Sequence, residues 1–425
     1  MKRLFLINDT IENKISYYLL AAFLIALPFN HFYSEWLFII FCLHTLIYIR
    51  KNSLSKLKDK KIWIIGSLFF LSASALLFSR YKSQGTKDAM QQIAFFLFPA
   101  FLAISNLNIR KYKYKLLELF GITCTVVVLY LLLETYKVIL YFHLPLASIL
   151  STPFLNQNFT SPIDVHPTYF AMYVLLSICI FINLSFRREA PKNRYIIFCI
   201  VLLAGLIQLS ARAPLLAAEI IFIFAIPVFL LNKKNKIVFS LCAIFVSLLF
   251  FISVSQTQSL RKRYWTDLEN DLSYYQDPGD LTESRLMRWD LEWQLISNSP
   301  LIGYGSGSEK DILKEKYFEN KYYRSFLLGL NAHNQYLSFM LNEGVIGLFL
   351  YLCVIIYGLS KAVRGKDFLL GCFIIILIVV SFSENILDVS KGVLFYSFFF
   401  PLFLFTLNVK GGYAKNNSFG QPQFD

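Results

Sequence analysis

The stretch RKNSLSKLKDKKIWIIGSLFFLSASALLF, residues 50–78, contains the pattern that decides the fold. Six Lys or Arg residues lie within 50–61, and an apolar run without a single charge follows at 62–78. A run of about 17–25 apolar residues is long enough to cross the hydrocarbon core of a bilayer as a helix. Comparable runs recur along the whole chain. The sequence therefore predicts an all-α integral membrane protein.

Composition supports the same class. The chain has 425 residues, of which 56% are hydrophobic and 16% charged, and a soluble protein cannot bury so large an apolar share. All seven cysteines fall inside apolar runs, with neither a disulfide framework nor a metal-ligand spacing. The net charge of +14 lies mostly in short loops that suit anionic lipid, and no compact basic domain exists for nucleic acid. We predict membrane lipid as a partner, and no nucleic acid, metal or cofactor.

Twelve transmembrane helices are predicted. Their ranges are 15–30, 34–49, 62–79, 92–107, 116–141, 167–185, 194–210, 213–231, 236–255, 334–360, 367–383 and 389–408. Among the short loops, those after even-numbered helices are rich in Lys and Arg, whereas those after odd-numbered helices have almost none, with 80–88 as the exception. Basic loops stay in the cytoplasm, so both termini are expected there. The predicted organisation is helices one to nine in 1–255, an extracytoplasmic loop in 256–333, helices ten to twelve in 334–408, and a cytoplasmic tail in 409–425.

The single large loop, 256–333, is expected to be helical. In TESRLMRWDLEWQLISNSP, 282–300, apolar side chains recur at three- and four-residue spacing, which predicts an amphipathic helix from an N-cap at Thr282 to Pro300. The following LIGYGSGSEKD, 301–311, favours a turn over a phosphate loop, because no strand precedes it and no Gly-Lys-Ser/Thr follows. A second helix is expected at 309–320.

Unusual polar residues collect on the predicted outer side of the membrane, where polar groups are functional by default. Each also has a structural interpretation: a lipid-anchoring arginine, a solvated helix face, a capping histidine or an ion-paired carboxylate. The candidate residues are His166, Arg212, Arg285, Arg288, His333, Asn334, Glu343 and Glu384.

Two arginines and a histidine at a membrane–water boundary suit a lipid-linked pyrophosphate. Guanidinium groups bind phosphate oxygens in bidentate fashion and stay charged. A pyrophosphate leaving group needs its developing charge stabilised, and the first outer loop has only Glu35 rather than a paired-acid motif for a metal. An imidazole can take a proton from a hydroxyl near neutral pH.

These segments resemble the signature region of the O-antigen ligase and polymerase superfamily. The resemblance rests on SRLMRW (284–289), NSPLIGYGSG (298–307), AHNQYLSFMLNEGVIGLFLYL (332–352) and SENILDVSKGVLFY (383–396), together with SARA (210–213) and HPTYF (166–170). It implies a fold like that of C-type membrane glycosyltransferases, in the inner membrane of a bacterium. It also implies metal-independent, inverting transfer of a glycan from undecaprenyl diphosphate at the periplasmic face, to lipid A–core in ligases or to another repeat unit in polymerases.

The resemblance also implies roles for residues. Arg212 and Arg285 would hold the diphosphate, and His333 would be the base that activates the acceptor hydroxyl. The other candidates, Arg288, Asn334, His166, Glu343 and Glu384, would assist or support these three. Many relatives have glycine before the loop arginine, whereas this chain has Ser284.

Several functions remain open at the level of sequence. A polymerase uses the same motifs as a ligase, and a ligase that glycosylates proteins belongs to the same superfamily. A polysaccharide flippase or other transporter could also have twelve spans. A transporter, however, places its polar residues near the bilayer midplane, often in paired broken helices.

Overall fold

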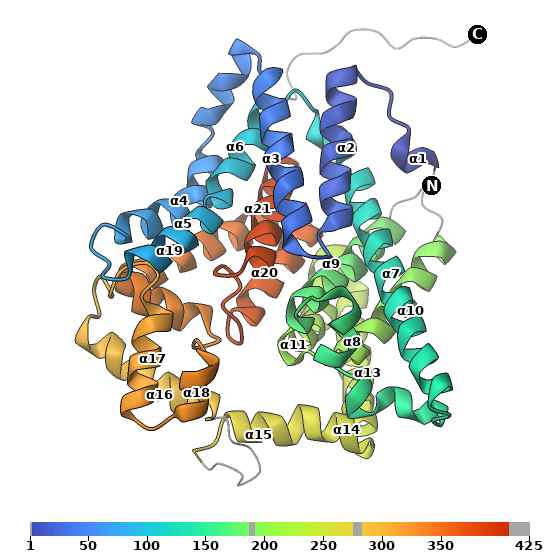
Figure 1. Ribbon diagram of the computed structural model, residues 1–425. Coiled ribbons are helices and arrows are strands. Elements are labelled where there is room, and N and C mark those ends of the chain that lie inside the picture. Colours follow the sequence, from blue (N-terminus) through green and yellow to red (C-terminus); the bar gives the residue numbers. More distant parts are fainter. Residues whose placement is uncertain (1, 187–191, 275–282, 408–425) are drawn as a thin grey trace.

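The computed structural model describes residues 2–186, 192–274 and 283–407, and these form helices and no strand (Figure 1). Five of the helices are long and apolar enough to cross a membrane. The predicted all-α membrane class is confirmed in this coarse form. The predicted tail at 409–425 lies outside the described residues.

Helix length separates the apolar helices into two groups. The five long ones are α7 (Ile109–Tyr141), α9 (Pro167–Ser185), α11 (Arg212–Ile220) continued through η5 (Ile221–Ala225) and α12 (Ile226–Leu230), α13 (Lys233–Gln256) and α19 (Gln335–Gly365). The shorter ones include α2 (Ile11–Ala26), α3 (His31–Ile47), α4 (Lys60–Ala75), α6 (Ala94–Ile104), α10 (Lys192–Leu209), α20 (Phe368–Val380) and α21 (Ser390–Phe405). A helix thus occupies each of the twelve predicted ranges, but the number of helices that cross the membrane remains a prediction.

The centre of the molecule is built from helices that are apolar all round. α9 and α21 have nearly every side chain buried, and α20 packs against both. α13 is the opposite case, because no residue of its most apolar stretch is buried inside the protein. Apolar side chains that the rest of the protein leaves unburied can be sheltered from water only by lipid. α13 is therefore expected to contact lipid on most of its surface.

The remaining helices are short and lie before or between the apolar ones. They are α1 (Lys2–Phe5), η1 (Lys51–Lys58), α5 (Lys82–Gln92), η2 (Leu146–Leu150), η3 (Thr152–Phe154), α8 (Gln157–Thr160) and η4 (Ser161–Ile163). Those of the predicted outer loop are α14 (Gln258–Arg261), η6 (Lys262–Thr266), α15 (Asp267–Asp271), α16 (Arg285–Asn298), α17 (Glu309–Glu319) and α18 (Tyr323–Leu328). Figure 1 shows α14 to α18 gathered at one end of the molecule, opposite α1.

The amphipathic helix of the outer loop begins later than predicted. Its N-cap is Ser284, in an extended conformation, and the Ser284 hydroxyl accepts a hydrogen bond of 3.2 Å from the N–H of Met287. The predicted N-cap, Thr282, lies outside the described residues. The N-cap assignment to Thr282 is therefore wrong, because Ser284 is the residue that satisfies a free N–H of the first turn. The second loop helix, α17, lies where it was expected.

α19 is broken where the sequence predicted a continuous helix over 334–360. Gly344 has φ +68 and ψ −163, which interrupts the helical hydrogen bonds. The glycine-rich segment after α16 fills the gap: the N–H groups of Tyr304 and Gly305 donate to the carbonyls of Leu341 and Asn342, at 2.9 and 2.8 Å. Backbone groups freed inside a membrane protein need such partners. Residues 301–308 thus form a turn that fastens the predicted outer loop to α19, and α17 begins directly after it.

Candidate functional site

Arg212, Arg285 and His333 line one cavity of about 530 Å³, here named the arginine cavity. Its wall brings together residues from α11, α15 and α16 and from the turns before α9 and α19. This volume lies within the range of small-molecule sites, roughly 300–1,000 Å³. One part of the wall is apolar and includes Leu215, Leu216, Phe250, Phe251, Leu268 and Phe382. The cavity therefore combines charged side chains with an apolar lining.

The two arginines meet at one carboxylate. Arg212 and Arg285 are each the first residue of a helix, and an Nη of Arg212 is in short contact with Oδ2 of Asp271. Nε of Arg285 lies 3.6 Å from the same oxygen, and its Nη1 donates to the carbonyl of Ser383 at 2.9 Å. Nη1 of Arg212 is buried and has no acceptor among the described residues. Arg212 and Arg285 are thus arranged around one carboxylate, and Nη1 of Arg212 remains without an acceptor among the described residues.

His333 is oriented by Glu384. The backbone of His333 has φ +51, just before the N-cap of α19, and its Nδ1 lies 3.2 Å from Oε2 of Glu384. Burial alone would raise the pKa of Glu384, but the hydrogen bond with His333 and the positive charges of His333, His166 and Arg285 together outweigh it and lower that pKa. An anionic Glu384 accepts the Nδ1 proton, so the lone pair of the neutral ring is on Nε2. No described residue hydrogen-bonds to that Nε2.

Two further basic residues line the arginine cavity. His166, a predicted candidate, directly precedes α9, and burial lowers its pKa while Glu384 opposes the shift. Arg263, in η6, was not predicted; its Nε lies 3.4 Å from the carbonyl of Ser210 and its Nη1 3.4 Å from Asp267. Burial, then the charge of Arg212, lowers the pKa of Arg263. The run LRKRYW, residues 260–265, places three basic residues side by side and was the signal in the sequence.

Three predicted candidates do not line the arginine cavity. Arg288 is buried and donates to the carbonyl of Asn331 at 3.0 Å, so it supports the backbone beside His333 instead of a substrate phosphate. The Asn334 side chain caps α19 by accepting hydrogen bonds from two N–H groups of the first turn. Glu343 accepts a hydrogen bond of 3.1 Å from Ser72 and lines a different cavity. Their spacing along the chain could not show this, because it does not reveal which neighbouring element each side chain meets in the folded protein.

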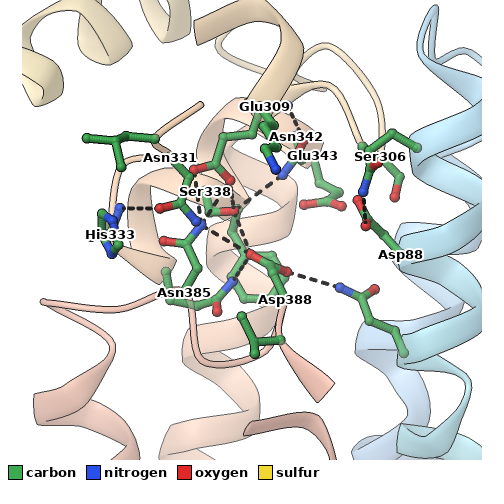
Figure 2. Close-up of a pocket in the computed structure, with 18 of the residues that line it drawn as sticks. Asp88, Ser306, Glu309, Asn331, His333, Ser338, Asn342, Glu343, Asn385 and Asp388 are labelled. Carbon is green, nitrogen blue, oxygen red and sulfur yellow. Dashed lines mark hydrogen bonds between the residues drawn. The ribbon is translucent and has the colours of Figure 1, made fainter. Parts of the chain in front are cut away.

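That different cavity, here named the polar cavity, has a volume of about 340 Å³ and is shown in Figure 2. Glu309 of α17 is one of the lining residues: its Oε1 accepts from the N–H of Ala332 at 3.1 Å, and the Asn385 amide donates to both carboxylate oxygens at 3.0 Å. Burial, then the charge of Asp388, raises the pKa of Glu309 to about 7. His333 lines the polar cavity as well as the arginine cavity. It stands between the two.

Residues 197–352 match a family model described as O-antigen ligase. This range holds Arg212, Arg285 and His333, the residues that converge on the arginine cavity. The predicted resemblance to the O-antigen ligase and polymerase superfamily is confirmed over this range. A similar protein of Rickettsia conorii, described as a candidate polysaccharide ligase, is 28% identical over 254 residues, which are 54% of this chain and 58% of that protein. The chain thus matches little more than half the length of that relative.

The O-antigen ligase match leaves part of the site uncovered. His166 precedes the matched range, and Glu384 and Asp388 follow it. These residues reach His333 or the polar cavity only through the packing of α9 and α21 against α20, which in turn packs against α19. The superfamily relationship therefore covers the arginines and the histidine, while the tertiary structure adds the carboxylates around them.

Proposed function

We propose that this chain is a membrane glycosyltransferase of the O-antigen ligase type. It transfers a glycan from undecaprenyl diphosphate to a hydroxyl of lipid A–core, at the periplasmic face of the bacterial inner membrane, with inversion and without a metal ion. The observation that carries the proposal is the convergence of Arg212 and Arg285 on one carboxylate oxygen, in a cavity that His333 also lines.

The arginines bind the donor diphosphate. Asp271 supplies the oxygen that both guanidinium groups contact, and a phosphate oxygen would take its place. The Nη1 of Arg212, which has no acceptor among the described residues, offers another hydrogen bond to the same anion. Guanidinium groups stabilise the negative charge that grows on a departing diphosphate. The apolar part of the wall suits the first isoprene units of the donor, next to the phosphates.

His333 is the general base. Its Nε2 takes the proton from the acceptor hydroxyl as that oxygen attacks the anomeric carbon from the side opposite the diphosphate. The bond from the anomeric carbon to the phosphate oxygen breaks, and undecaprenyl diphosphate leaves with the electron pair. The anionic Glu384 stabilises the resulting imidazolium through Nδ1. Arg263 and His166 add positive charge and polarity to the same cavity wall.

The test is transfer by the full-length protein in lipid nanodiscs, with undecaprenyl-diphosphate-linked glycan and lipid A–core as substrates. His333→Ala is expected to fold normally and lose about 10²–10⁴-fold in rate. Arg285→Lys is expected to lose a comparable factor, because a point charge does not replace a planar fork. Matched controls are His143→Ala and Arg324→Lys, which change residues that line neither cavity. Wild-type rates in either site variant would refute the corresponding role.

Deleting the gene separates a ligase from a polymerase. Loss of all glycan-capped lipid A–core on a gel indicates a ligase, because the ligase performs the only step onto that acceptor. A ladder that collapses to one repeat unit per core indicates a polymerase. A transporter would form no new glycosidic bond in the nanodisc assay, so any linked product there excludes transport as the sole activity.

A further inference from the structure

One wall of the polar cavity plays no part in the donor site. Gln84, Asp88 and Gln92 line it from α5, at successive intervals of four residues. Residues spaced in this way lie on one face of a helix. α5 is also held close to the outer loop, because a Cβ on Gly85 would lie 2.5 Å from the carbonyl oxygen of Ser306. The three side chains thus form a fixed polar row facing the cavity.

The row has hydrogen-bonding capacity that the protein does not use. Gln92 is only 5% exposed, and its Oε1 has no donor among the described residues. Its Nε2 donates to Asp388 at 3.1 Å, while Nε2 of Gln84 donates to Asp88 at 2.8 Å. A buried amide oxygen without a donor is costly, so a ligand that supplies a hydroxyl there is favoured. Planar amides and carboxylates at several angles suit a ring bearing many hydroxyls.

The position of His333 connects this wall to the chemistry. His333 lines both cavities, and the donor diphosphate belongs to the arginine cavity under the function proposed above. We propose that the polar cavity binds the acceptor sugar, with the α5 row holding the sugar ring so that one of its hydroxyls reaches His333. The volume of about 340 Å³ is at the lower end for small-molecule sites, which suits a single sugar unit at the end of a glycan.

The carboxyl groups that line the polar cavity favour an uncharged acceptor sugar over an acidic one. Asp88, Glu309, Glu343 and Asp388 line the cavity with Lys310 as the one cation among the described lining residues. Burial, then the charge of Asp388, raises the pKa of Asp88 to about 6, so the cavity already disfavours its own negative charges. A phosphorylated sugar or a uronic acid would add another. A neutral sugar donates hydroxyl groups to the carboxylates without that cost.

Binding of free sugars tests the proposal without any transfer reaction. The full-length protein in nanodiscs is examined by saturation-transfer NMR with methyl glycosides of glucose, galactose and mannose, with N-acetylglucosamine, and with glucuronate and glucose 6-phosphate. At least one neutral sugar is expected to bind, and the two acidic ones at least tenfold more weakly. Absence of binding by every neutral sugar, or equal binding of an acidic one, would overturn the proposal.

Variants locate the binding site. Gln84→Ala combined with Gln92→Ala is expected to weaken the neutral sugar about tenfold, the effect of one or two lost hydrogen bonds. Gln91→Ala is the matched control, because Gln91 is on the same helix but does not line the cavity. Thermal unfolding of each variant checks folding, and the single Gln84→Ala variant replaces the double one if that fails. If a folded Gln84→Ala/Gln92→Ala variant binds the sugar as wild type does, the α5 row is not the sugar-binding site.

The same samples distinguish this inference from the proposed function. In the transfer assay, the double variant is expected to raise the KM for acceptor about tenfold and to leave the KM for donor unchanged, whereas Arg285→Lys leaves sugar binding unchanged. Loss of sugar binding in Arg285→Lys would place the sugar in the arginine cavity and refute the inference. If the wild-type protein binds a neutral sugar through Gln84 and Gln92 but catalyses no glycan transfer, the proposed function is refuted and the sugar-binding inference stands.

Discussion

Asp271 has two opposing effects on an anion that enters the arginine cavity. Its carboxylate neutralises the mutual repulsion of Arg212 and Arg285 when no substrate is bound, and it competes with the substrate for the same guanidinium groups. Both partners are only about one-fifth exposed, so solvent screens the competition weakly. The carboxylate must move aside before a diphosphate can bind both arginines.

The Asp271→Asn variant is expected to bind the donor more tightly. Removing the charge leaves the two arginines unneutralised, so the KM for undecaprenyl-diphosphate-linked glycan should fall roughly fivefold, about 1 kcal/mol. Steady-state kinetics with varied donor measure this. Asp290→Asn, whose carboxylate contacts Tyr274 instead, is the matched control. A rise in the KM for donor would mean that Asp271 positions the arginines and does not compete with the substrate.

The raised pKa of Glu309 predicts that the stability of the folded protein depends on pH. The folded protein keeps the Glu309 proton until about pH 7, whereas an unfolded carboxyl loses it near 4.5. The folded state therefore binds more protons within this window, so its free energy of unfolding falls as the pH rises from about 4.5 to 7. The Glu309→Gln variant removes this contribution, which is about 1–3 kcal/mol. Thermal unfolding from pH 5 to 7.5 should give a flatter profile in Glu309→Gln than in wild type.

The control for that comparison is Glu319→Gln, which changes an exposed carboxylate at the end of the same helix. Its profile should follow the wild type. If Glu309→Gln also follows the wild type, then Glu309 is ionised across this range and its network with Asn385 does not hold a proton.

At the scale of elements, the break in α19 couples the outer loop to the membrane helices. The turn after α16 supplies N–H groups to two carbonyls of α19, and the N–H of Val345 donates to the carbonyl of Pro300 at 2.8 Å. The first half of α19 starts beside His333, and Glu343 stands at the break. The break therefore sets where both cavities lie relative to the outer loop.

Gly344→Ala is expected to disrupt this coupling. An alanine at φ +68 is strained, and its Cβ would lie 2.2 Å from the carbonyl oxygen of Leu301, so the turn must shift. We expect a loss of more than about 3 kcal/mol, detected as a lower melting temperature and a smaller monodisperse fraction after detergent extraction. Gly329→Ala is the control, because it has φ +57 but a nearest contact of 3.4 Å. Equal effects in both variants would assign the loss to φ alone.

At the scale of the whole molecule, orientation in the membrane follows from the basic loops. The predicted cytoplasmic loop 50–61 and the predicted periplasmic loop 256–333 should face opposite sides. Asn52→Cys and Asn320→Cys place one thiol in each. In intact cells, a membrane-impermeant maleimide is expected to label the cysteine at 320 and to reach the one at 52 only after permeabilisation. The parent chain, whose own cysteines lie in apolar segments, controls for background. The reverse labelling pattern would invert the topology and place the arginine cavity in the cytoplasm.

The sequence by itself determined the all-α membrane class, because apolar runs must be helical to satisfy their backbone in lipid. It also pointed to Arg212, because a charge at a membrane boundary is costly unless it is used. It pointed to Arg285 and His333 through the resemblance to the O-antigen ligase and polymerase superfamily. Only the tertiary structure decided that they share a cavity with Arg263 and Asp271, that Arg288 and Glu343 turn away from it, and that α5 adds a polar wall beside His333. The physical reason is distance along the chain: the Glu384 contact with His333 spans 51 residues, and Gln92 reaches Asp388 across 296. Local periodicity places a side chain on a helix face, but only packing between helices decides what that face meets.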